Sequence, residues 1–341
     1  MNKINILLNG VGRIGKAILR IALQRKSFNI VAINELNQNL ENIAYLINYD
    51  STYGKLEDKF KVNNSYIENK TSKIQILNHP LLEDIDFKKL NIDIVIDASG
   101  AKVNMDNLRL LSPKLFFLTH PSKDANINII LGVNENNINF NKHKIISTSS
   151  CNATSLLPLL KFIDDNYTIN CGDITTIHPL LNHQKTLDSQ CIGSSNRQIE
   201  CSFEFGRSST QNIIPSKTTT IDACSFVQEN INHNLLSSNS FRVPTSVVGA
   251  INVTLFVNKP IFKDKLIEQL NNYQKEQKHK IIYNNFDPLV SGDFAKCEHT
   301  TIIDHRYTQI LNQHMIKLVL WYDNEWGYAS KVVDIVSLSK I

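Results

Sequence analysis

The segment Gly10-Val11-Gly12-Arg13-Ile14-Gly15 constrains the fold more than any other part of the chain. It follows an apolar run, residues 4–9, that is typical of a buried strand, and it opens a segment, residues 14–23, whose apolar side chains recur at helical spacing. An acidic residue, Glu35, stands at the end of the next apolar run. Such a turn, with an acidic residue about 20 positions further on, is the pattern of a βαβ dinucleotide-binding unit. An ordinary turn between a strand and a helix is the alternative.

The residues of this turn have separate physical roles in such a site. Gly10 permits the tight turn, Gly12 lets the backbone approach a pyrophosphate, and Gly15 allows the helix to pack closely on the strand. The free N–H groups of the helix that begins at Arg13-Ile14 attract the pyrophosphate. Glu35 is expected to accept hydrogen bonds from the adenosine ribose, and its charge repels a 2′-phosphate. The pattern therefore favours NAD over NADP as the cofactor.

The chain has 341 residues, which is long for one core and predicts two domains. Up to residue 150, short apolar runs alternate with helical patterns, as in an α/β domain with a Rossmann-type doubly wound parallel sheet. The second half of the chain predicts longer strands over residues 173–178, 250–257 and 316–322. Apolar side chains alternate with other residues along 250–257, which indicates a mixed or antiparallel sheet in an α+β domain. Residues 189–216 show no period, and 327–338 are helical in pattern. The strands expected in the first domain are 4–9, 30–34, 92–98, 115–119, 127–131 and 144–147.

Charge, hydropathy and cysteine spacing exclude several classes of protein. The net charge of +4 includes no basic block, so we expect no nucleic-acid partner. No run of 18 apolar residues occurs, and the first apolar run leads into the glycine turn rather than to a cleavage site, so we expect a cytoplasmic protein without a membrane span. The six cysteines are widely spaced, without a C-x-x-C pair, which argues against disulfides and against a zinc site.

Cys151 lies at a predicted junction between a strand and a helix. It follows Ser149 and Ser150, either of which could cap the helix that continues from residue 153. Unpaired N–H groups and the helix dipole favour a thiolate at such a position, although a buried structural cysteine fits the pattern equally well. His178 ends the strand 173–178, where an imidazole could serve Cys151 as a general base. The spacing in sequence does not show whether the two side chains meet.

Taken together, the motifs resemble those of the glyceraldehyde-3-phosphate dehydrogenase family along essentially the whole chain. Three details are more similar to the erythrose-4-phosphate dehydrogenase branch than to the glycolytic one: Glu35 in VAINEL, the Thr119-His120-Pro121 segment, and Pro179-Leu180-Leu181 after His178. The matching stretches are, in order, NGVGRIGK, VAINEL, YDSTYG, LGVN, STSSCNATS, TTIH, NIIPS, FRVPT, PLVSGDF and WYDNEWGYASKVVD.

The resemblance implies an NAD-dependent aldehyde dehydrogenase in which Cys151 is the nucleophile, His178 is the base and Asn324 holds the nicotinamide carboxamide. It implies a homotetramer, with residues 189–216 near a subunit interface. It also implies an NAD-binding domain over 1–150, completed by a C-terminal helix within 322–341, and a catalytic domain over 151–321. Further expected contacts are Thr119 for the cofactor and Ser150, Asn152, Arg207, Thr218 and Arg242 for the phosphorylated substrate or an anion.

Three departures from the family pattern bear on the reaction. Asn152 and Leu181 each stand where the family has threonine, and the turn at 216–219 reads Ser-Lys-Thr-Thr instead of Ser-Ser-Thr-Gly. An anion site that loses donors binds its anion less well, although Lys217 could restore some positive charge. The leading hypothesis is therefore non-phosphorylating oxidation of D-erythrose 4-phosphate to 4-phosphoerythronate, an early step towards pyridoxal phosphate. Phosphorylating glyceraldehyde-3-phosphate dehydrogenase of glycolysis is the first alternative, and a nucleotide-binding protein without turnover is a remote one.

Overall fold

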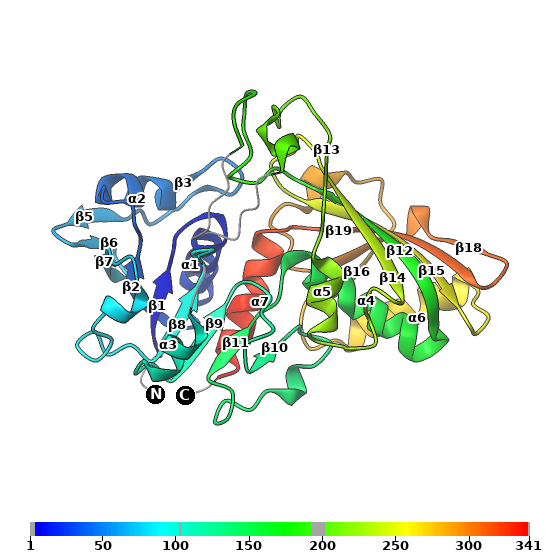
Figure 1. Ribbon diagram of the computed structural model, residues 1–341, viewed down its shortest axis with the longest axis horizontal. Coiled ribbons are helices and arrows are strands. Elements are labelled where there is room, and N and C mark those ends of the chain that lie inside the picture. The colour runs from blue at the N-terminus through cyan, green and yellow to red at the C-terminus, as the bar shows by residue number, and fades with distance from the viewer. Residues whose placement is uncertain (1–3, 102–103, 192–201, 340–341) are drawn as a thin grey trace. The chain divides into compact units, whose positions relative to one another are not determined.

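The computed structural model describes residues 4–101, 104–191 and 202–339 (Figure 1). Contacts within the chain group it into two units. Unit 1 comprises Met1–Asn128, Asn137–Thr148 and Ala329–Ile341, and unit 2 comprises Ile129–Asn136 and Ser149–Tyr328. The boundaries differ from the expected ones in three places, because unit 2 also includes residues 129–136, 149–150 and 322–328.

Unit 1 is built on a nine-stranded sheet in the order β10-β11-β9-β8-β1-β2-β7-β6-β5. Its strands are parallel except for β5 and β6, which form an antiparallel hairpin added to β7. A separate two-stranded ribbon, β3–β4, follows α2. The elements are β1 (Asn5–Asn9), α1 (Arg13–Arg25), β2 (Asn29–Asn34), α2 (Leu40–Asn48), β3 (Tyr49–Asp50), β4 (Gly54–Lys55), β5 (Lys61–Asn63), β6 (Tyr66–Glu68), β7 (Lys73–Leu77), β8 (Ile94–Asp97), α3 (Met105–Leu110), β9 (Leu115–Leu118), β10 (Ile127–Asn128) and β11 (Ile145–Ser147).

The predicted Rossmann-type architecture of this unit is confirmed. From β1 the chain passes through α1 to β2 on one side, and it later returns to β8 on the other side of β1 (Figure 1). The strand order therefore reverses between β1 and β8, and in such sheets the crevice at the carboxyl ends of these strands binds the ligand. One expected strand is wrong in extent: of residues 127–131 only Ile127–Asn128 pair with a neighbour, β11.

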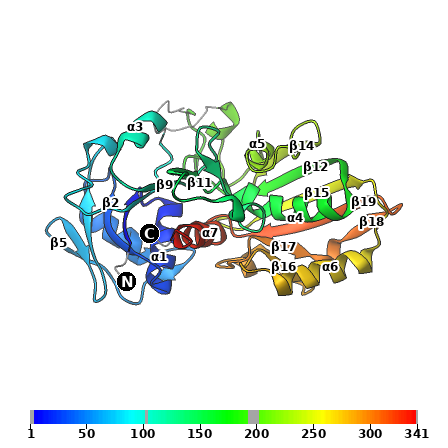
Figure 2. The same cartoon turned by 90° about the horizontal axis from the view of Figure 1, so that it is seen from below.

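Unit 2 contains a mixed sheet in the order β13-β14-β12-β15-β19-β17-β16, with β18 paired to β19. Helix α4 packs against β12, β15 and β17 (Figure 2). Buried and half-buried residues alternate along β19, so one face of the sheet is covered and the other is more open. The elements are α4 (Cys151–Tyr167), β12 (Ile169–His178), β13 (Ile214–Ser216), α5 (Thr220–Ser225), β14 (Leu236–Arg242), β15 (Gly249–Val257), α6 (Lys263–Glu276), β16 (Ile282–Asn285), β17 (Thr301–Asp304), β18 (Gln309–Leu311) and β19 (Met315–Tyr322). The last helix, α7 (Trp326–Ser337), begins in unit 2 and belongs to unit 1 from Ala329 on.

The aperiodic segment 189–216 is described only in part, because residues 192–201 lie outside the described residues. Its remainder contains a short 3-10 helix, Phe203–Gly206, and the edge strand β13. Further 3-10 helices are Leu82–Asp84, Glu135–Asn137, Ser291–Phe294 and His305–Tyr307.

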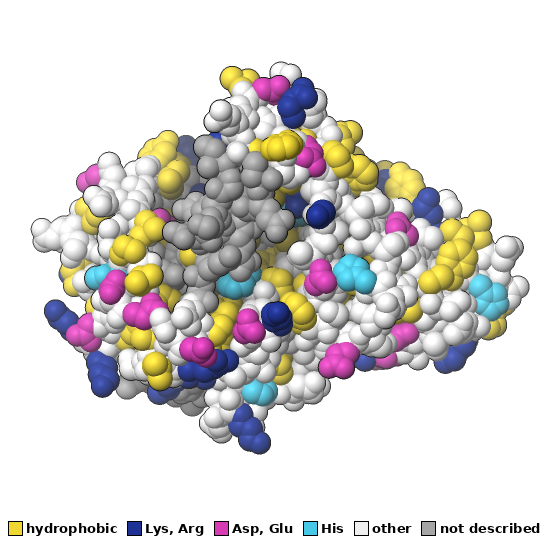
Figure 3. Space-filling view, viewed as in Figure 1, with side chains coloured by type: hydrophobic (Ala, Val, Ile, Leu, Met, Phe, Trp, Pro, Cys, Tyr) yellow, Lys and Arg dark blue, Asp and Glu magenta, His cyan; other side chains and the backbone are white. Residues whose placement is uncertain are grey.

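The surface carries charges of both signs, interspersed on the face that Figure 3 shows. No helix in the described part of the chain combines the length and the apolar character needed to cross a membrane.

Candidate active site

The glycine turn of unit 1 has no space for a side chain at Gly10 or Gly15, but it is open at Gly12. Gly10 has a φ of +89°, which favours glycine, and a Cβ there would lie 2.7 Å from Ser99 Cα. A Cβ at Gly15 would overlap the Gly10 carbonyl oxygen, whereas a Cβ at Gly12 would meet nothing within 4 Å. The turn therefore packs tightly on the β8 side and is open at Gly12, where α1 begins. This arrangement fits a pyrophosphate held on the N-terminal N–H groups of α1, Arg13 and Ile14 included.

The Glu35 carboxylate lies beside this turn. Its Oε2 accepts a hydrogen bond from Val11 N at 3.0 Å, and its Oε1 accepts one from Asn37 N at 3.3 Å. These bonds hold the carboxylate at the carboxyl end of β2, where a ribose hydroxyl is expected. Glu35 thus remains our choice for the residue that sets cofactor preference.

Arg13 and Thr119 are engaged within unit 1. The Arg13 Nη1 forms an ion pair with Asp50 Oδ2 at 2.6 Å, and Lys16 Nζ contacts the same oxygen at 3.2 Å. Burial alone would raise the pKa of Asp50, but the N–H groups of Tyr53 and Thr52 and the two cations lower it to about 2. The Thr119 hydroxyl donates to the carbonyl oxygen of Asp97 at 2.9 Å. Both side chains are therefore held by carboxylate or carbonyl oxygens of unit 1 itself.

Helix α4 begins at Cys151, with Ser150 as its N-cap. The Ser150 Oγ accepts a hydrogen bond from Ala153 N at 3.3 Å, which confirms one of the two caps expected from the sequence. Ser149, just before it, adopts a left-handed φ of +60°, and its carbonyl oxygen accepts from the Tyr328 hydroxyl at 3.0 Å. The turn before Cys151 is therefore held by a hydrogen bond from Ala153 N to Ser150 and by one from Tyr328 to Ser149.

Cys151 and His178 meet in unit 2, although the sequence separates them by 27 positions. The Cys151 Sγ lies 3.8 Å from His178 Nε2, and the His178 Nδ1 lies 2.8 Å from the carbonyl oxygen of Pro179. A carbonyl oxygen can only accept, so Nδ1 carries the proton and the neutral ring presents the lone pair of Nε2 to the thiol. This tautomer is the one that can take a proton from sulfur.

Burial keeps both groups uncharged in this structure. It raises the pKa of Cys151 to about 11, against the opposing effects of Arg242 and of the N–H groups at the start of α4. Burial and then Arg242 lower the pKa of His178 to about 3. The N–H groups at the helix N-terminus lower the pKa of Cys151, as expected from the sequence, but the loss of hydration on burial has the larger effect. A thiol that passes its proton to His178 as it reacts remains compatible with this geometry.

Arg242 ends β14 directly beside His178, its partner in the parallel register of β12 and β14. Its Nε and Nη1 are buried without a hydrogen-bond partner among the described residues. Burial lowers the pKa of Arg242, as expected for a cation without a neighbouring carboxylate. A buried cation with unused donors is the natural partner of an anionic ligand.

Asn152 points into unit 2 and is only 9% exposed. Its Oδ1 accepts from the Tyr322 hydroxyl at 2.6 Å, and its Nδ2 donates to Thr220 Oγ1 at 3.1 Å. The substrate contact expected of this side chain from the sequence stays a prediction. Thr218, half-buried, approaches the same group through Thr220, with 2.6 Å between the two hydroxyl oxygens.

Tyr322 is a site residue that sequence reasoning missed. It is 1% exposed at the end of β19, and its ring meets that of His178 edge to face, with centroids 6.5 Å apart. Gly249, its partner in the register of β15 and β19, makes room for it, because a Cβ at Gly249 would lie 2.6 Å from the Tyr322 hydroxyl oxygen. The alternating pattern of β19 predicts that Tyr322 is buried but gives no sign of its hydroxyl contact with Asn152.

Asn324 and Arg207 have different surroundings. The Asn324 Oδ1 accepts from Val248 N at 3.1 Å, which leaves the amide donors of Nδ2 for a carbonyl such as that of the nicotinamide. Arg207 is exposed and pairs with Asp188 at 2.9 Å. None of the hydrogen bonds or ion pairs in the described part of the chain joins Arg207 to Cys151 or His178.

The remaining cysteines contribute nothing to this cluster. Cys171 is exposed, Cys224 is buried and Cys297 is half-buried, and all three are free. Cys191 is disulfide-bonded, so the expectation that no disulfide forms is wrong for this residue.

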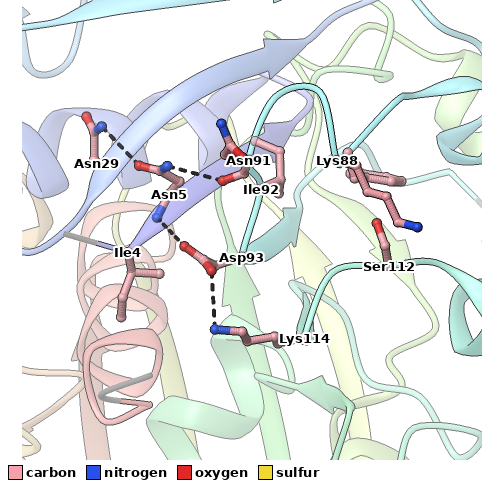
Figure 4. Close-up of a pocket in the computed structure, with 10 residues that line it drawn as sticks. Ile4, Asn5, Asn29, Lys88, Asn91, Ile92, Asp93, Ser112 and Lys114 are labelled. Atoms are coloured by element: carbon pink, nitrogen blue, oxygen red, sulfur yellow. Dashed lines mark hydrogen bonds and ion pairs between the residues drawn. The ribbon is translucent and has the colours of Figure 1, made fainter. Parts of the chain in front are cut away.

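A cavity of about 850 Å³ lies at the other edge of the unit 1 sheet, at the amino ends of β1, β2 and β9 (Figure 4). There the Asp93 Oδ2 accepts from Asn5 N at 3.0 Å, and its Oδ1 lies 3.4 Å from Lys114 Nζ. Its lining includes Asn29, Asn91 and Lys88 but neither a cysteine nor a histidine. The cavity therefore lacks the groups for covalent chemistry, and the Cys151 cluster remains the candidate active site.

A Rossmann-type unit and a unit that pairs a cysteine with a histidine together define an NAD-dependent oxidoreductase. Two family models match the chain: the NAD-binding domain of glyceraldehyde 3-phosphate dehydrogenase over residues 4–105, and the C-terminal domain of that enzyme over residues 150–324. The chain belongs to the glyceraldehyde-3-phosphate dehydrogenase family, and its N-terminal part is the NAD-binding domain.

Whole-length relatives agree with this assignment. The chain is 36% identical over 341 residues to the glyceraldehyde-3-phosphate dehydrogenase of Buchnera aphidicola subsp. Schizaphis graminum, with 98% of each chain covered. It is 33% identical over 336 residues to glyceraldehyde-3-phosphate dehydrogenase 1 of Kluyveromyces marxianus, again with 98% of each covered. It is also 33% identical to glyceraldehyde-3-phosphate dehydrogenase 2 of Staphylococcus aureus (strain MRSA252), covering 97% of this chain and 94% of the relative.

Proposed function

We propose that the protein oxidises D-erythrose 4-phosphate to 4-phosphoerythronate through a thioester on Cys151, with His178 as the base. The observation that carries this proposal is the 3.8 Å approach of Cys151 Sγ to the unprotonated Nε2 of His178. Beside this pair lies Arg242, whose Nε and Nη1 have no hydrogen-bond partner among the residues that the structure describes. Thiol, base and cation are the three groups that covalent oxidation of a phosphorylated aldehyde requires. The product would serve pyridoxal phosphate synthesis.

The chemistry follows from the neutral state of the pair. The Cys151 sulfur adds to the aldehyde carbon while its proton passes to His178 Nε2, which gives a hemithioacetal. The N–H groups at the start of α4 stabilise the developing oxyanion. His178 returns the thiol proton to this oxyanion, which completes the hemithioacetal, takes the same proton back from the hydroxyl as the hydride leaves and the thioester forms, and then releases it to solvent. NAD, when bound, supplies the acceptor for the hydride.

Release of the acid requires a nucleophile that attacks the thioester carbonyl. His178 Nε2 can remove a proton from an incoming water, so that the C–S bond breaks and the thiol is regenerated with that proton. A phosphate dianion would need donors of its own in the site. Leu181 offers none, and the Asn152 carboxamide is hydrogen-bonded to Tyr322 and Thr220. These observations favour water as the acceptor.

Phosphorylating glyceraldehyde-3-phosphate dehydrogenase is the second candidate, because the relatives described above carry that name. The deciding experiment compares initial rates with erythrose 4-phosphate and glyceraldehyde 3-phosphate, each with and without inorganic phosphate. Under our proposal, kcat/KM is higher for the four-carbon aldehyde, and NADH forms without phosphate. A strict phosphate requirement together with a preference for the three-carbon aldehyde would establish the glycolytic reaction.

We also propose a homotetramer in the cytoplasm. The open face of the unit 2 sheet supports an oligomer, since Ile177 and Phe241 are neighbours in register there and each is more than a third exposed. Exposed apolar neighbours on a sheet are typical of a covered interface. Light scattering coupled to size exclusion tests this: we expect four copies, and a smaller species for Phe241→Lys. A monomer at micromolar concentration would contradict it.

A further inference from the structure

Asp97 carries a buried carboxylate at the carboxyl end of β8. The residue is 2% exposed, and its Oδ1 accepts hydrogen bonds from Ser99 N at 3.2 Å, Ser99 Oγ at 2.7 Å and Asn9 Nδ2 at 2.8 Å. Its Oδ2 is buried as well but has no hydrogen-bond partner among the described residues. One oxygen of this carboxylate is therefore well supplied with donors, and the other receives none from the described part of the chain.

The direction of these hydrogen bonds is fixed by a backbone group. The His79 N–H donates to Asn34 Oδ1 and the His79 carbonyl oxygen accepts from Asn34 Nδ2, which sets the orientation of that amide. Asn34 Nδ2 also donates to Asn9 Oδ1 at 2.8 Å, so Asn9 Nδ2 is the atom that faces Asp97. Every hydrogen bond to Asp97 Oδ1 is thus donated to it, as an ionised carboxylate requires.

No cation balances this charge within the described part of the chain. None of the ion pairs there includes Asp97. His120, which follows β9, interacts electrostatically with Asp97, but burial lowers the pKa of His120 and outweighs the opposing effect of the carboxylate. The imidazole is therefore neutral at pH 8. Buried charges are normally paired within the protein or with a ligand, so an unpaired one at the edge of a cofactor-binding sheet points to a charge on that cofactor.

Asp97 belongs to the half of the sheet that receives the nicotinamide. A doubly wound sheet binds a dinucleotide across the point where the strand order reverses, with one mononucleotide on each half. Here the order reverses between β1 and β8, and Glu35, expected at the adenosine ribose, ends the half that contains β2. The other half contains β8 and β9. Asp97 ends the first of these strands, and Thr119 N, just after the second, donates to the Asp97 carbonyl oxygen at 3.0 Å.

We propose that Asp97 is a specificity-determining residue whose charge makes the protein bind the oxidised cofactor in preference to the reduced one. The nicotinamide ring of NAD carries a positive charge, which is lost when NADH forms. The buried Asp97 carboxylate attracts the charged ring through a protein interior that screens charges weakly, and it has no such effect on the neutral ring. Its effect on the pyrophosphate is the same for both forms and cancels in the ratio of their Kd values.

Asp97→Asn tests this proposal because it removes the charge and keeps the shape of the side chain. The experiment measures the Kd of NAD and of NADH by calorimetry at pH 8, without an aldehyde. Two unit charges about 10 Å apart at an effective dielectric constant near 20 change a Kd roughly tenfold. We therefore expect the ratio of the Kd of NAD to that of NADH to rise about tenfold. An unchanged ratio, including a parallel rise of both Kd values through distortion of the crevice, would overturn the proposal.

ADP-ribose separates the charge of Asp97 from its structural role, because this probe has the pyrophosphate but no nicotinamide. Under the proposal, Asp97→Asn raises the Kd of NAD relative to that of ADP-ribose about tenfold as well. The Kd of NADH relative to that of ADP-ribose should stay within about twofold, since neither ligand carries the ring charge. A change in that second ratio as large as in the first would show that Asp97 shapes the nicotinamide site rather than acting through its charge.

Two controls and one replacement variant complete the design. Asp93→Asn removes the same charge just before β8, at the opposite edge of the sheet, and should leave all three ratios unchanged. His120→Gln replaces the neutral imidazole by a neutral amide and should also leave them unchanged, whereas a tenfold shift there would assign the selection to His120 instead. If Asp97→Asn does not fold, Asp97→Ser removes the charge with a smaller side chain, and the same ratios decide.

These measurements need bound cofactor but no turnover. They are therefore independent of whether the enzyme oxidises erythrose 4-phosphate or glyceraldehyde 3-phosphate, and of whether water or phosphate releases the acid. Failure of the proposed function would leave the expected ratios as they are, and unchanged ratios in Asp97→Asn would remove Asp97 from cofactor selection without touching the proposed reaction.

Discussion

His178 and Arg242 occupy paired positions at the ends of the adjacent parallel strands β12 and β14. The guanidinium lowers the pKa of the imidazole, second only to burial in its effect. Because its Nε and Nη1 lack hydrogen-bond partners within the described part of the chain, we expect Arg242 to bind a phosphate that arrives with the substrate. The pairing of His178 with Arg242 therefore places the residue proposed to bind the substrate phosphate where it also lowers the pKa of the proposed base.

Arg242→Gln is expected to raise the KM of a phosphorylated aldehyde about ten- to a hundredfold, the loss associated with a hydrogen bond to a charged group. It should also raise the pKa of His178, because a neighbouring positive charge is removed. Steady-state kinetics and NMR titration of the His178 ring measure the two effects. Arg109→Gln, on the surface of unit 1, is the matched control, and an unchanged KM for Arg242→Gln would remove Arg242 from the substrate site.

Cys151→Ser should abolish aldehyde oxidation and leave NAD binding largely intact. With a pKa near 11, Cys151 in the unliganded enzyme should react with iodoacetamide about ten times faster for each pH unit between 7 and 10, because the thiolate is the reactive form. Peptide mapping is needed to separate it from the exposed Cys171. A Cys151 rate that levels off below pH 8 would contradict the raised pKa.

His178→Asn should lower the rate of acylation about a hundredfold or more, the scale of a lost general base. The measurement is the burst of NADH in a stopped-flow experiment. Since the imidazole is neutral, its removal takes no positive charge from the sulfur, and we expect no rise in the pKa of Cys151. A normal burst would exclude His178 as the base.

Glu35→Ser should narrow the preference for NAD over NADP, because the carboxylate held by Val11 N no longer repels a 2′-phosphate. The unmodified enzyme should use NAD far better than NADP. The ratio of kcat/KM values for the two cofactors measures the effect. Equal values in the unmodified enzyme would show that Glu35 does not select the cofactor.

Asp50→Asn should destabilise unit 1 by about 2 kcal/mol at pH 7, from the lowering of the Asp50 pKa to about 2. The sign follows from linkage: the folded pKa lies below the unfolded value, so this stabilisation is present above about pH 4 and is lost as the pH falls towards 2. Urea unfolding of both proteins at several pH values measures it. The two stabilities should converge in acid, and a constant difference down to pH 2 would contradict the assignment.

Secondary structure could be predicted from the sequence where the pattern that specifies an element lies within that element. Buried parallel strands are continuous apolar runs, so β1, β2, β8 and β9 were predictable within about two residues. The start of α4 was predictable as well, because Ser150 next to Cys151 is a local capping pattern. The hairpin β5–β6 was not, since its strands are short and polar and are specified by pairing with β7.

What the sequence could not predict depends on residues that are distant along the chain. The pKa of Cys151 depends on burial and on Arg242, 91 positions away, and not only on the helix terminus that the sequence indicates. The hydrogen bond between Asn152 and Tyr322, 170 positions away, has no signal in the sequence either. Arg207 was assigned to the substrate site by resemblance alone. In the structure its side chain is paired with Asp188, a contact that the resemblance did not indicate.

Gly249 lacks the one carbon atom that would collide with the Tyr322 hydroxyl. Positions 249 and 322 are therefore sterically coupled: a side chain at 249 would overlap the aromatic ring at 322 unless that ring were replaced by a smaller side chain. Replacing the ring alone removes one of the two hydrogen-bond partners of Asn152. For laboratory evolution of this enzyme, libraries that randomise the two codons together would reach sequences that stepwise mutagenesis cannot.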